Sequence, residues 1–164
     1  MVKKNLLVGI CFLLFGISSK AQFADHRKTL LDSEFVKGDI IKMPAVLYDL
    51  GKPTMRPESM DSLKLVFDFL QLYPYLAVEI SVHLDSRSSQ NSSANISFSR
   101  AKTCLDSLVK LGIAPERLTA KGYGITKPMV PETMISKLPK ADQEKAYAMN
   151  RRTELKIVSV SFTK

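Results

Sequence analysis

The sequence predicts an α/β fold of the βαβαβ type, a two-layer sandwich in which a small mixed sheet packs against two main helices. Residues 76–83 alternate apolar and polar side chains, as a half-buried strand does. Residues 153–157 repeat this alternation near the end of the chain. Between the two, residues 94–110 carry apolar side chains at helical spacing. Strand and helix patterns that succeed one another in this way are typical of α/β domains.

The first residues have the three parts of an export signal. A pair of lysines precedes the apolar stretch 6–17, and a small-residue cleavage pattern follows at residues 19–21. The apolar stretch is shorter than the ~20 residues that a membrane-spanning helix needs. We therefore expect residues 1–21 to be a cleaved signal peptide, with an uncleaved membrane anchor as the alternative. Ile10 stands before Cys11 where lipid attachment requires a small residue, which argues against a lipoprotein.

The rest of the chain suits one domain. Residues 22–35 are polar and mixed, and we interpret them as a lead-in or linker to a domain over residues 36–164. The segment 38–50 predicts two short strands or one bent strand, because Pro44 interrupts its apolar residues. Turn chemistry follows at residues 49–53.

A first main helix is predicted to begin near Pro57, since proline suits the first turn of a helix. Its expected core face consists of four residues at helical spacing: Met60, Leu63, Phe67 and Leu70. Pro74 ends this helix, and the alternating strand follows. We expect the even-numbered residues of that strand in the core and the odd-numbered residues on its opposite face.

The second main helix, residues 94–110, follows a serine-rich loop. Ser92 or Ser93 is expected to cap this helix, and Gly112 to end it. Its expected core stripe is Ser97, Ala101, Cys104, Leu105, Leu108 and Val109. Cleavage of the signal leaves Cys104 as the only thiol, so the mature domain has no internal disulfide.

The last third of the chain returns to the sheet. A short strand is predicted over residues 117–124, then a loop with helical pieces, then one or two helical turns at residues 141–149. The final strand begins at Arg152, and its apolar residues change phase near 157–158. A β-bulge explains such a change of phase.

Two charged residues stand out between these elements. Asp85 lies just past the end of the strand 76–83, and Arg100 lies early in the second main helix. A carboxylate accepts hydrogen bonds from an ammonium, and a guanidinium pairs with a carboxylate. The two side chains therefore suit the two ends of a zwitterion, while a purely structural ion pair between them is the alternative.

Four short motifs follow one another along the chain: H-x-D at 83–85, S-x-x-R-A at 97–101, G-Y-G at 122–124 and N-R-R at 150–152. In order and spacing they resemble the OmpA-like C-terminal domain, the domain type of OmpA, Pal and MotB. The resemblance covers roughly residues 36–158. Residues 48–51 also match the F-D-x-G segment that lies beside the ligand groove in that family.

The resemblance implies non-covalent binding of peptidoglycan. Asp85 is then expected to hold the ammonium at the far end of diaminopimelate, and Arg100 its carboxylate. Asn150 and Arg151 are expected beside the ligand groove. His83, which opens the H-x-D motif, completes the expected ligand-binding set as a hydrogen-bonding residue at the strand end.

Three positions depart from the usual pattern of that family. Leu84 replaces a hydroxyl residue, Ser88 replaces a glycine, and Ser93 replaces an asparagine. Loss of one ligand-orienting hydrogen bond typically costs ~1 kcal/mol. The departures therefore predict weaker or altered ligand binding, although the charged pair persists.

The sequence offers no candidate for catalysis or metal binding. Its two histidines, His26 and His83, have no cysteine or carboxylate at metal-ligand spacing. No serine lies in a nucleophile elbow, and residues 122–124 lack the lysine and helix of a phosphate loop. The net charge of +8 forms no basic stripe interleaved with aromatics. We expect no enzymatic activity, no metal, no cofactor and no nucleic-acid partner.

The prediction is thus a periplasmic, outer-membrane-associated protein that anchors the cell envelope to diaminopimelate-type peptidoglycan. An outer-membrane or envelope protein is the expected kind of protein partner. The alternative is a periplasmic interaction module of the same fold that has lost or altered wall binding. A hydrolase or transferase acting on the wall is a third class, for which the chain lacks a metal cluster, a Cys–His pair and a pair of catalytic glutamates.

Overall fold

The computed structural model describes residues 27–163. The expected signal peptide, residues 1–21, and Cys11 lie outside the described residues, so export and cleavage stay predictions. Within residues 27–163, no helix combines the length and the apolar content needed to cross a membrane.

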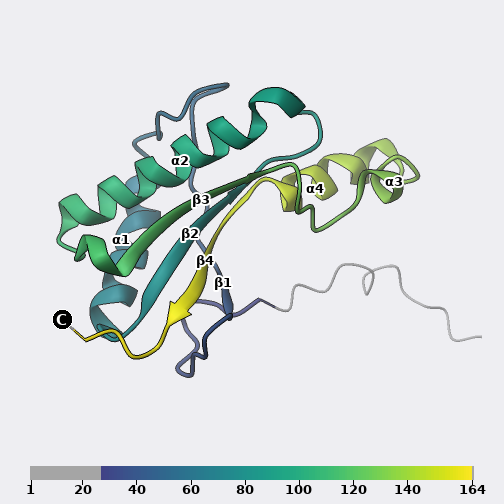
Figure 1. Cartoon of the computed structure of the whole chain (residues 1–164). Coiled ribbons are helices and arrows are strands. Elements are labelled where there is room, and N and C mark those ends of the chain that lie inside the picture. Colours follow the sequence, from purple (N-terminus) through teal and green to yellow (C-terminus); the bar gives the residue numbers. More distant parts are fainter. Residues whose placement is uncertain (1–26, 164) are drawn as a thin grey trace, which may run out of the picture.

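A mixed four-stranded sheet forms one layer of the domain (Figure 1). The strands are β1 (Ile40–Lys42), β2 (Ala77–His83), β3 (Leu118–Gly124) and β4 (Arg152–Ser159). Their order in space is β1-β4-β2-β3. β2 and β3 run parallel, whereas β4 is antiparallel to both β1 and β2. The last strand of the chain is therefore an inner strand.

Two main helices form the second layer. α1 (Ser59–Leu72) and α2 (Gln90–Leu111) cover the same face of the sheet, as Figure 1 shows. The hydrophobic core lies between these helices and the sheet. The remaining helices are the 3-10 turn η2 (Pro115–Arg117), α3 (Glu132–Ile135) and α4 (Lys140–Asn150), and Figure 1 places α3 and α4 beyond one end of the sheet. The structure confirms the predicted α/β sandwich.

The strand pattern of the sequence is confirmed in β2 and β4. Val78, Ile80 and Val82 are buried in the core, because alternate side chains of a strand share one face. Ala77 of β2 pairs with Ser159 of β4, whereas the next residue, Val78, pairs with Ile157. One residue of β4 therefore bulges between these two pairs. This is the bulge that the change of apolar phase predicted.

The apolar face of α1 differs from the prediction at one position. Met60 is 43% exposed, although its spacing suited the predicted face. Val66 and Phe69 are buried instead, beside the correctly predicted Leu63 and Leu70. The helix carries apolar residues on two adjoining faces, so spacing alone did not fix which of them packs on the sheet.

α2 begins earlier than predicted because its first turn is made of polar residues. Gln90 opens the helix, and Ser93 lies inside it rather than at its cap, with its hydroxyl donating to the Gln90 carbonyl at 3.1 Å. The end of α2 is as predicted, since Gly112 has a left-handed φ of 112°. The predicted core stripe is confirmed, and Cys104 is fully buried in it.

Two glycines of β3 allow α2 to pack directly on the sheet. A Cβ on Gly122 would lie 2.1 Å from the backbone nitrogen of Phe98. Gly124 has a φ of +51°, and its amide donates to the Ser97 hydroxyl at 2.9 Å. The predicted tight turn therefore holds for Gly124, whereas Gly122 serves the close approach of the two backbones.

The lead-in packs on the domain before residue 36. Lys28 forms a bridge with Ile41 of β1. Phe35 belongs to the core, where its ring centroid lies 5.2 Å from those of Phe69 and Tyr73. In the described part of the chain, the packed domain thus begins earlier than the predicted boundary.

Candidate functional site

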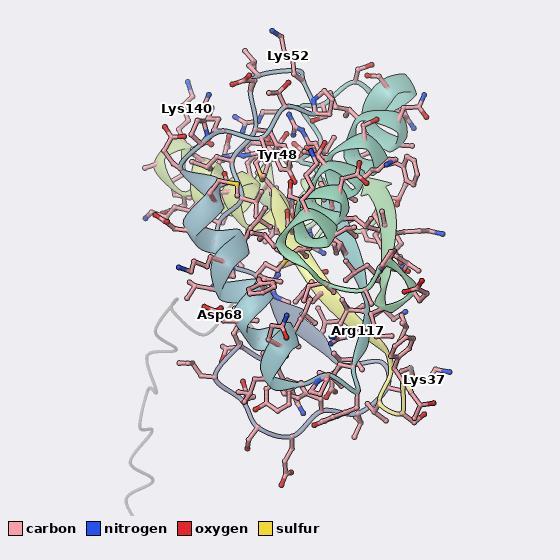
Figure 2. The ribbon with its side chains drawn as sticks, turned by 90° about the vertical axis from the view of Figure 1, so that its left-hand side faces the viewer. Lys37, Tyr48, Lys52, Asp68, Arg117 and Lys140 are labelled. Carbon is pink, nitrogen blue, oxygen red and sulfur yellow. The ribbon has the colours of Figure 1, made fainter. Side chains whose placement is uncertain are left out.

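A groove of about 910 Å³ runs past the ends of β2 and β4. Its walls come from the segment after β1, from α2 and from α4. Seven cationic side chains line it, and no described lining residue is a carboxylate: the cations are Arg27, Lys42, Arg56, Arg100, Lys145, Arg151 and Arg152. Figure 2 shows Tyr48, which lines the groove, and Lys52 near one end of the molecule, with Lys37 toward the other end. Five of these cations, namely Arg27, Arg56, Lys145, Arg151 and Arg152, pair with carboxylates that lie outside the lining, so the case for an anionic ligand depends on Arg100.

Arg100 is held in the groove by backbone carbonyls. It extends from α2, and its Nε donates to the carbonyl of Lys52 at 3.0 Å and its Nη2 to that of Asp49 at 3.2 Å. Burial lowers the pKa of Arg100, although the group remains a cation at any physiological pH. Within residues 27–163, Arg100 forms no ion pair with a carboxylate. Its positive charge is therefore positioned but not neutralised.

The ring of Tyr48 packs against the Arg100 guanidinium. Its ring centroid lies 4.8 Å from the Arg100 guanidinium carbon, a cation–π distance. The Tyr48 hydroxyl lies 2.9 Å from the sulfur of Cys104 and donates to the backbone carbonyl of Arg100 at 3.2 Å. Burial raises the pKa of Tyr48, and it raises that of Cys104 to about 11, so both groups are neutral near pH 7.

Asp85 is buried at the end of β2 and is paired with two arginines. Its Oδ2 accepts from Arg87 Nη2 at 2.7 Å and from Arg151 Nη1 at 2.5 Å. Its Oδ1 accepts from the backbone N–H of Arg87 at 3.2 Å. Burial raises the pKa of Asp85, but the hydrogen bonds from Arg87 and Arg151 outweigh burial and lower it below its ordinary value. Asp85 is therefore a carboxylate near neutral pH.

Asp85 and Arg100 form no ion pair with each other, so the structural pair that we held as the alternative is not formed. Sequence patterns did not single out Arg87, which lies in the loop after β2. Its position two residues after Asp85 was the available indication, since short side-chain-to-backbone contacts of this kind are common for aspartate in loops.

Glu144 on α4 closes a network around Asp85. Arg87 donates to it at 2.8 Å, and Arg151 donates to it at 2.7 Å. The Arg87 guanidinium also lies 4.2 Å from the ring centroid of Tyr147. We call Asp85, Arg87, Glu144 and Arg151 the Asp85 network. Its two acids and two arginines balance in charge, and Arg151 joins it to the groove.

His83 lies on the sheet face opposite the helices. It is 3% exposed, and its ring stacks on Tyr123 with centroids 5.0 Å apart. Its Nε2 lies 3.1 Å from Oε2 of Glu154, and Arg27 and Arg152 donate to Oε1 of the same carboxylate, each at 2.7 Å. Burial raises the pKa of Glu154, but His83 and Arg152 outweigh burial and bring it to about 2. His83 lines the groove as part of a buried polar cluster.

Asn150 does not present its side chain to the groove. Its Oδ1 accepts from the backbone N–H groups of Met129 and Val130, and its Nδ2 donates to the Val130 carbonyl at 2.8 Å. The side chain is buried and fastens the loop before α3 to the end of α4. The motif thus placed Asn150 near the groove, but its contacts are those of a positioning residue rather than of a ligand contact.

Two departures from the family pattern also have structural roles. Leu84 is buried, and its amide donates to the Gly124 carbonyl at 2.8 Å. The amide of Ser88 donates to the Asp85 carbonyl at 3.1 Å, which closes the turn after the strand. Leu84 lines the groove with an apolar surface where a hydroxyl was expected.

Comparisons with known proteins agree with this architecture. The sequence profile of the OmpA family matches residues 47–141. Outer membrane porin F of Pseudomonas fluorescens is 33% identical over 112 residues, which cover 68% of this chain and 32% of the porin. The chain thus spans about a third of the length of that relative.

Two solved structures share the fold. The periplasmic domain of Helicobacter pylori MotB superposes with a TM-score of 0.62 at 18% identity, over 77% of this chain and 86% of that domain. The peptidoglycan-associated lipoprotein of Burkholderia pseudomallei superposes with a TM-score of 0.54 at 20% identity, over 68% of this chain and 87% of that chain.

Proposed function

Because the chain belongs to the OmpA family, we propose that it binds peptidoglycan without a covalent bond and anchors the cell envelope from the periplasm. The name of the lipoprotein that shares its fold, which states an association with peptidoglycan, supports this proposal. The outer-membrane relative supports a place at the outer membrane. The export signal predicted at residues 1–21 is part of the same proposal.

The observation that carries the proposal is the state of Arg100. Two backbone carbonyls and the Tyr48 ring fix its guanidinium in the groove, and its charge has no acidic partner within residues 27–163. A guanidinium held in this way is pre-organised for a carboxylate, because little side-chain freedom is lost on binding. The stem peptides of peptidoglycan carry such carboxylates.

The finer proposal concerns diaminopimelate, whose far end carries an ammonium and a carboxylate. Arg100 takes the carboxylate, and Asp85 takes the ammonium. Oδ1 of Asp85 accepts only one backbone N–H within the described residues, and a carboxylate oxygen has two lone pairs. Arg151 and His83 line the groove, and Arg151 also contacts Asp85, so both belong to the proposed ligand-binding set.

A pull-down with insoluble peptidoglycan tests the proposal. Wild type is expected to sediment with the wall, and Arg100→Ala is expected to stay in the supernatant while keeping its fold by circular dichroism. Lys110→Ala is the matched control, since Lys110 is an exposed cation in the last turn of the same helix. Release of soluble muropeptides would instead indicate a hydrolase.

The Asp85 network favours one alternative function. Asp85 is already paired with two arginines, and Leu84 stands where a ligand-orienting hydroxyl was expected. Both features suit a module of the same fold that has lost wall binding and kept a protein partner. Failure of the wild-type protein to sediment with peptidoglycan would exclude wall binding, and capture of an envelope protein by the same sample would then support this alternative.

A further inference from the structure

We propose that the side chain of Arg87 occupies the ammonium subsite of Asp85 and competes there with amine-bearing ligands. The inference rests on the proposed function, because the competing ligand is the amine of a stem peptide. It assigns to Arg87 a specificity-determining role.

The geometry is that of a substitute ligand. Arg87 reaches Oδ2 of Asp85 through two nitrogens, with Nη2 at 2.7 Å and Nε at 3.2 Å. A ligand ammonium seeks the same carboxylate with the same charge and the same N–H donors. The carboxylate is only 5% exposed, because the guanidinium groups of Arg87 and Arg151 both lie on its Oδ2, and Arg87 covers one of the approaches that a ligand would use.

Arg87 contacts α4 at the same time as Asp85, so these other contacts can hold the side chain when it leaves the carboxylate. Its Nη1 and Nη2 donate to Glu144 at 2.8 Å and 3.3 Å, and its guanidinium lies over the Tyr147 ring. Both partners belong to α4. The side chain is 49% exposed and extends from a loop, whereas its backbone N–H contacts Oδ1 of Asp85 separately. Displacement of the side chain therefore leaves the main-chain contact in place.

The size of the competition follows from the strength of the pair. Partly exposed ion pairs change equilibria by a factor of up to about five. A ligand that binds only the open state has its affinity lowered by the fraction of time that this state is populated. Removal of the Arg87 guanidinium is therefore expected to tighten amine binding about five-fold.

Calorimetric titration with a stem peptide that ends in diaminopimelate tests this inference. The variant is Arg87→Gln, which removes the charge and keeps the backbone N–H. The matched control is Lys37→Gln, which removes one positive charge from an exposed turn toward the other end of the molecule (Figure 2). A second control is the same peptide with its terminal amine acetylated.

Arg87→Gln is expected to bind the free peptide about five-fold more tightly than wild type, whereas Lys37→Gln matches wild type. The gain should vanish with the acetylated peptide, because that peptide has no ammonium to place on Asp85. If wild type binds and Arg87→Gln binds equally or more weakly, the competing role of Arg87 is refuted and the proposed function stands. If neither protein binds the peptide, both the proposed function and the role of Arg87 fall.

Discussion

The carboxylate of Glu154 makes the stability of this domain depend on pH in a way that one substitution isolates. Glu154 lies on β4 and is 4% exposed. Burial raises its pKa, but the contacts with His83 and Arg152 outweigh burial and lower it from its ordinary value of 4.5 to about 2. The folded state therefore prefers the ionised carboxylate more strongly than the unfolded state does.

The sign and size of the effect follow from this difference. A carboxyl whose pKa is lower in the folded state contributes stability above its ordinary pKa, and the contribution is lost as pH falls through the folded-state pKa. The fall from 4.5 to about 2 corresponds to about 3 kcal/mol, at about 1.4 kcal/mol per pKa unit. The contribution is complete near pH 7 and declines between about pH 5 and about pH 2.

Urea unfolding of wild type and Glu154→Gln from pH 7 to pH 3 measures the contribution of Glu154 to the free energy of unfolding. The variant is expected to be less stable by about 3 kcal/mol at pH 7, because its neutral amide leaves the clustered cations uncompensated. The difference in unfolding free energy between the two proteins should shrink by about half at pH 3, because Glu154 of the wild type is losing its contribution there. The other acids titrate alike in both proteins and cancel in the difference. Glu116→Gln, at an exposed acid, is the control and should track wild type. A gap that is equal at pH 7 and pH 3 would refute the electrostatic account of Glu154.

Two further predictions concern packing. Gly122→Ala is expected to destabilise the domain by about 3 kcal/mol or more, because its Cβ would meet the backbone nitrogen of Phe98 at 2.1 Å. Thermal melting should show a much smaller loss, about 1 kcal/mol, for Gly38→Ala, where nothing lies within 4 Å and only the positive φ opposes the substitution. Cys104 is expected to react with a thiol reagent only at the rate of unfolding, since it is buried and its pKa lies at about 11. Rapid labelling of the native protein would contradict its core position.

The regular parts of the fold could be predicted because their side chains repeat with the period of the backbone. The alternation in β2 predicted its buried face, and the change of phase near Ile157 predicted the bulge in β4. The predicted start of α2 was wrong because its first turn consists of polar residues. A polar helical turn and a polar loop have the same composition, so the sequence did not separate them. Met60 was misplaced because two faces of α1 satisfied the same spacing.

For the candidate site, the order of the motifs along the chain predicted which residues lie near one another, but nothing finer. Motif order brought Arg100, Arg151 and His83 to one groove. It did not give the direction of each side chain, so the inward orientation of Asn150 was not foreseen. Arg87 lies in a loop without periodic neighbours, and its position two residues after Asp85 was the one indication of its contact with that carboxylate.

The place of β4 in the sheet has a consequence for how the molecule assembles. β4 is the last element of the chain and lies between β1 and β2, so those two strands have no common partner until residues 152–159 are available. Contacts between strands so distant in sequence form late, because loop closure must come first. Arg151 immediately precedes β4, so the groove is completed in the same step as the sheet. A chain cut before Arg152 would lose an inner strand rather than an edge strand, and with it two residues that line the groove, Arg152 and Thr153.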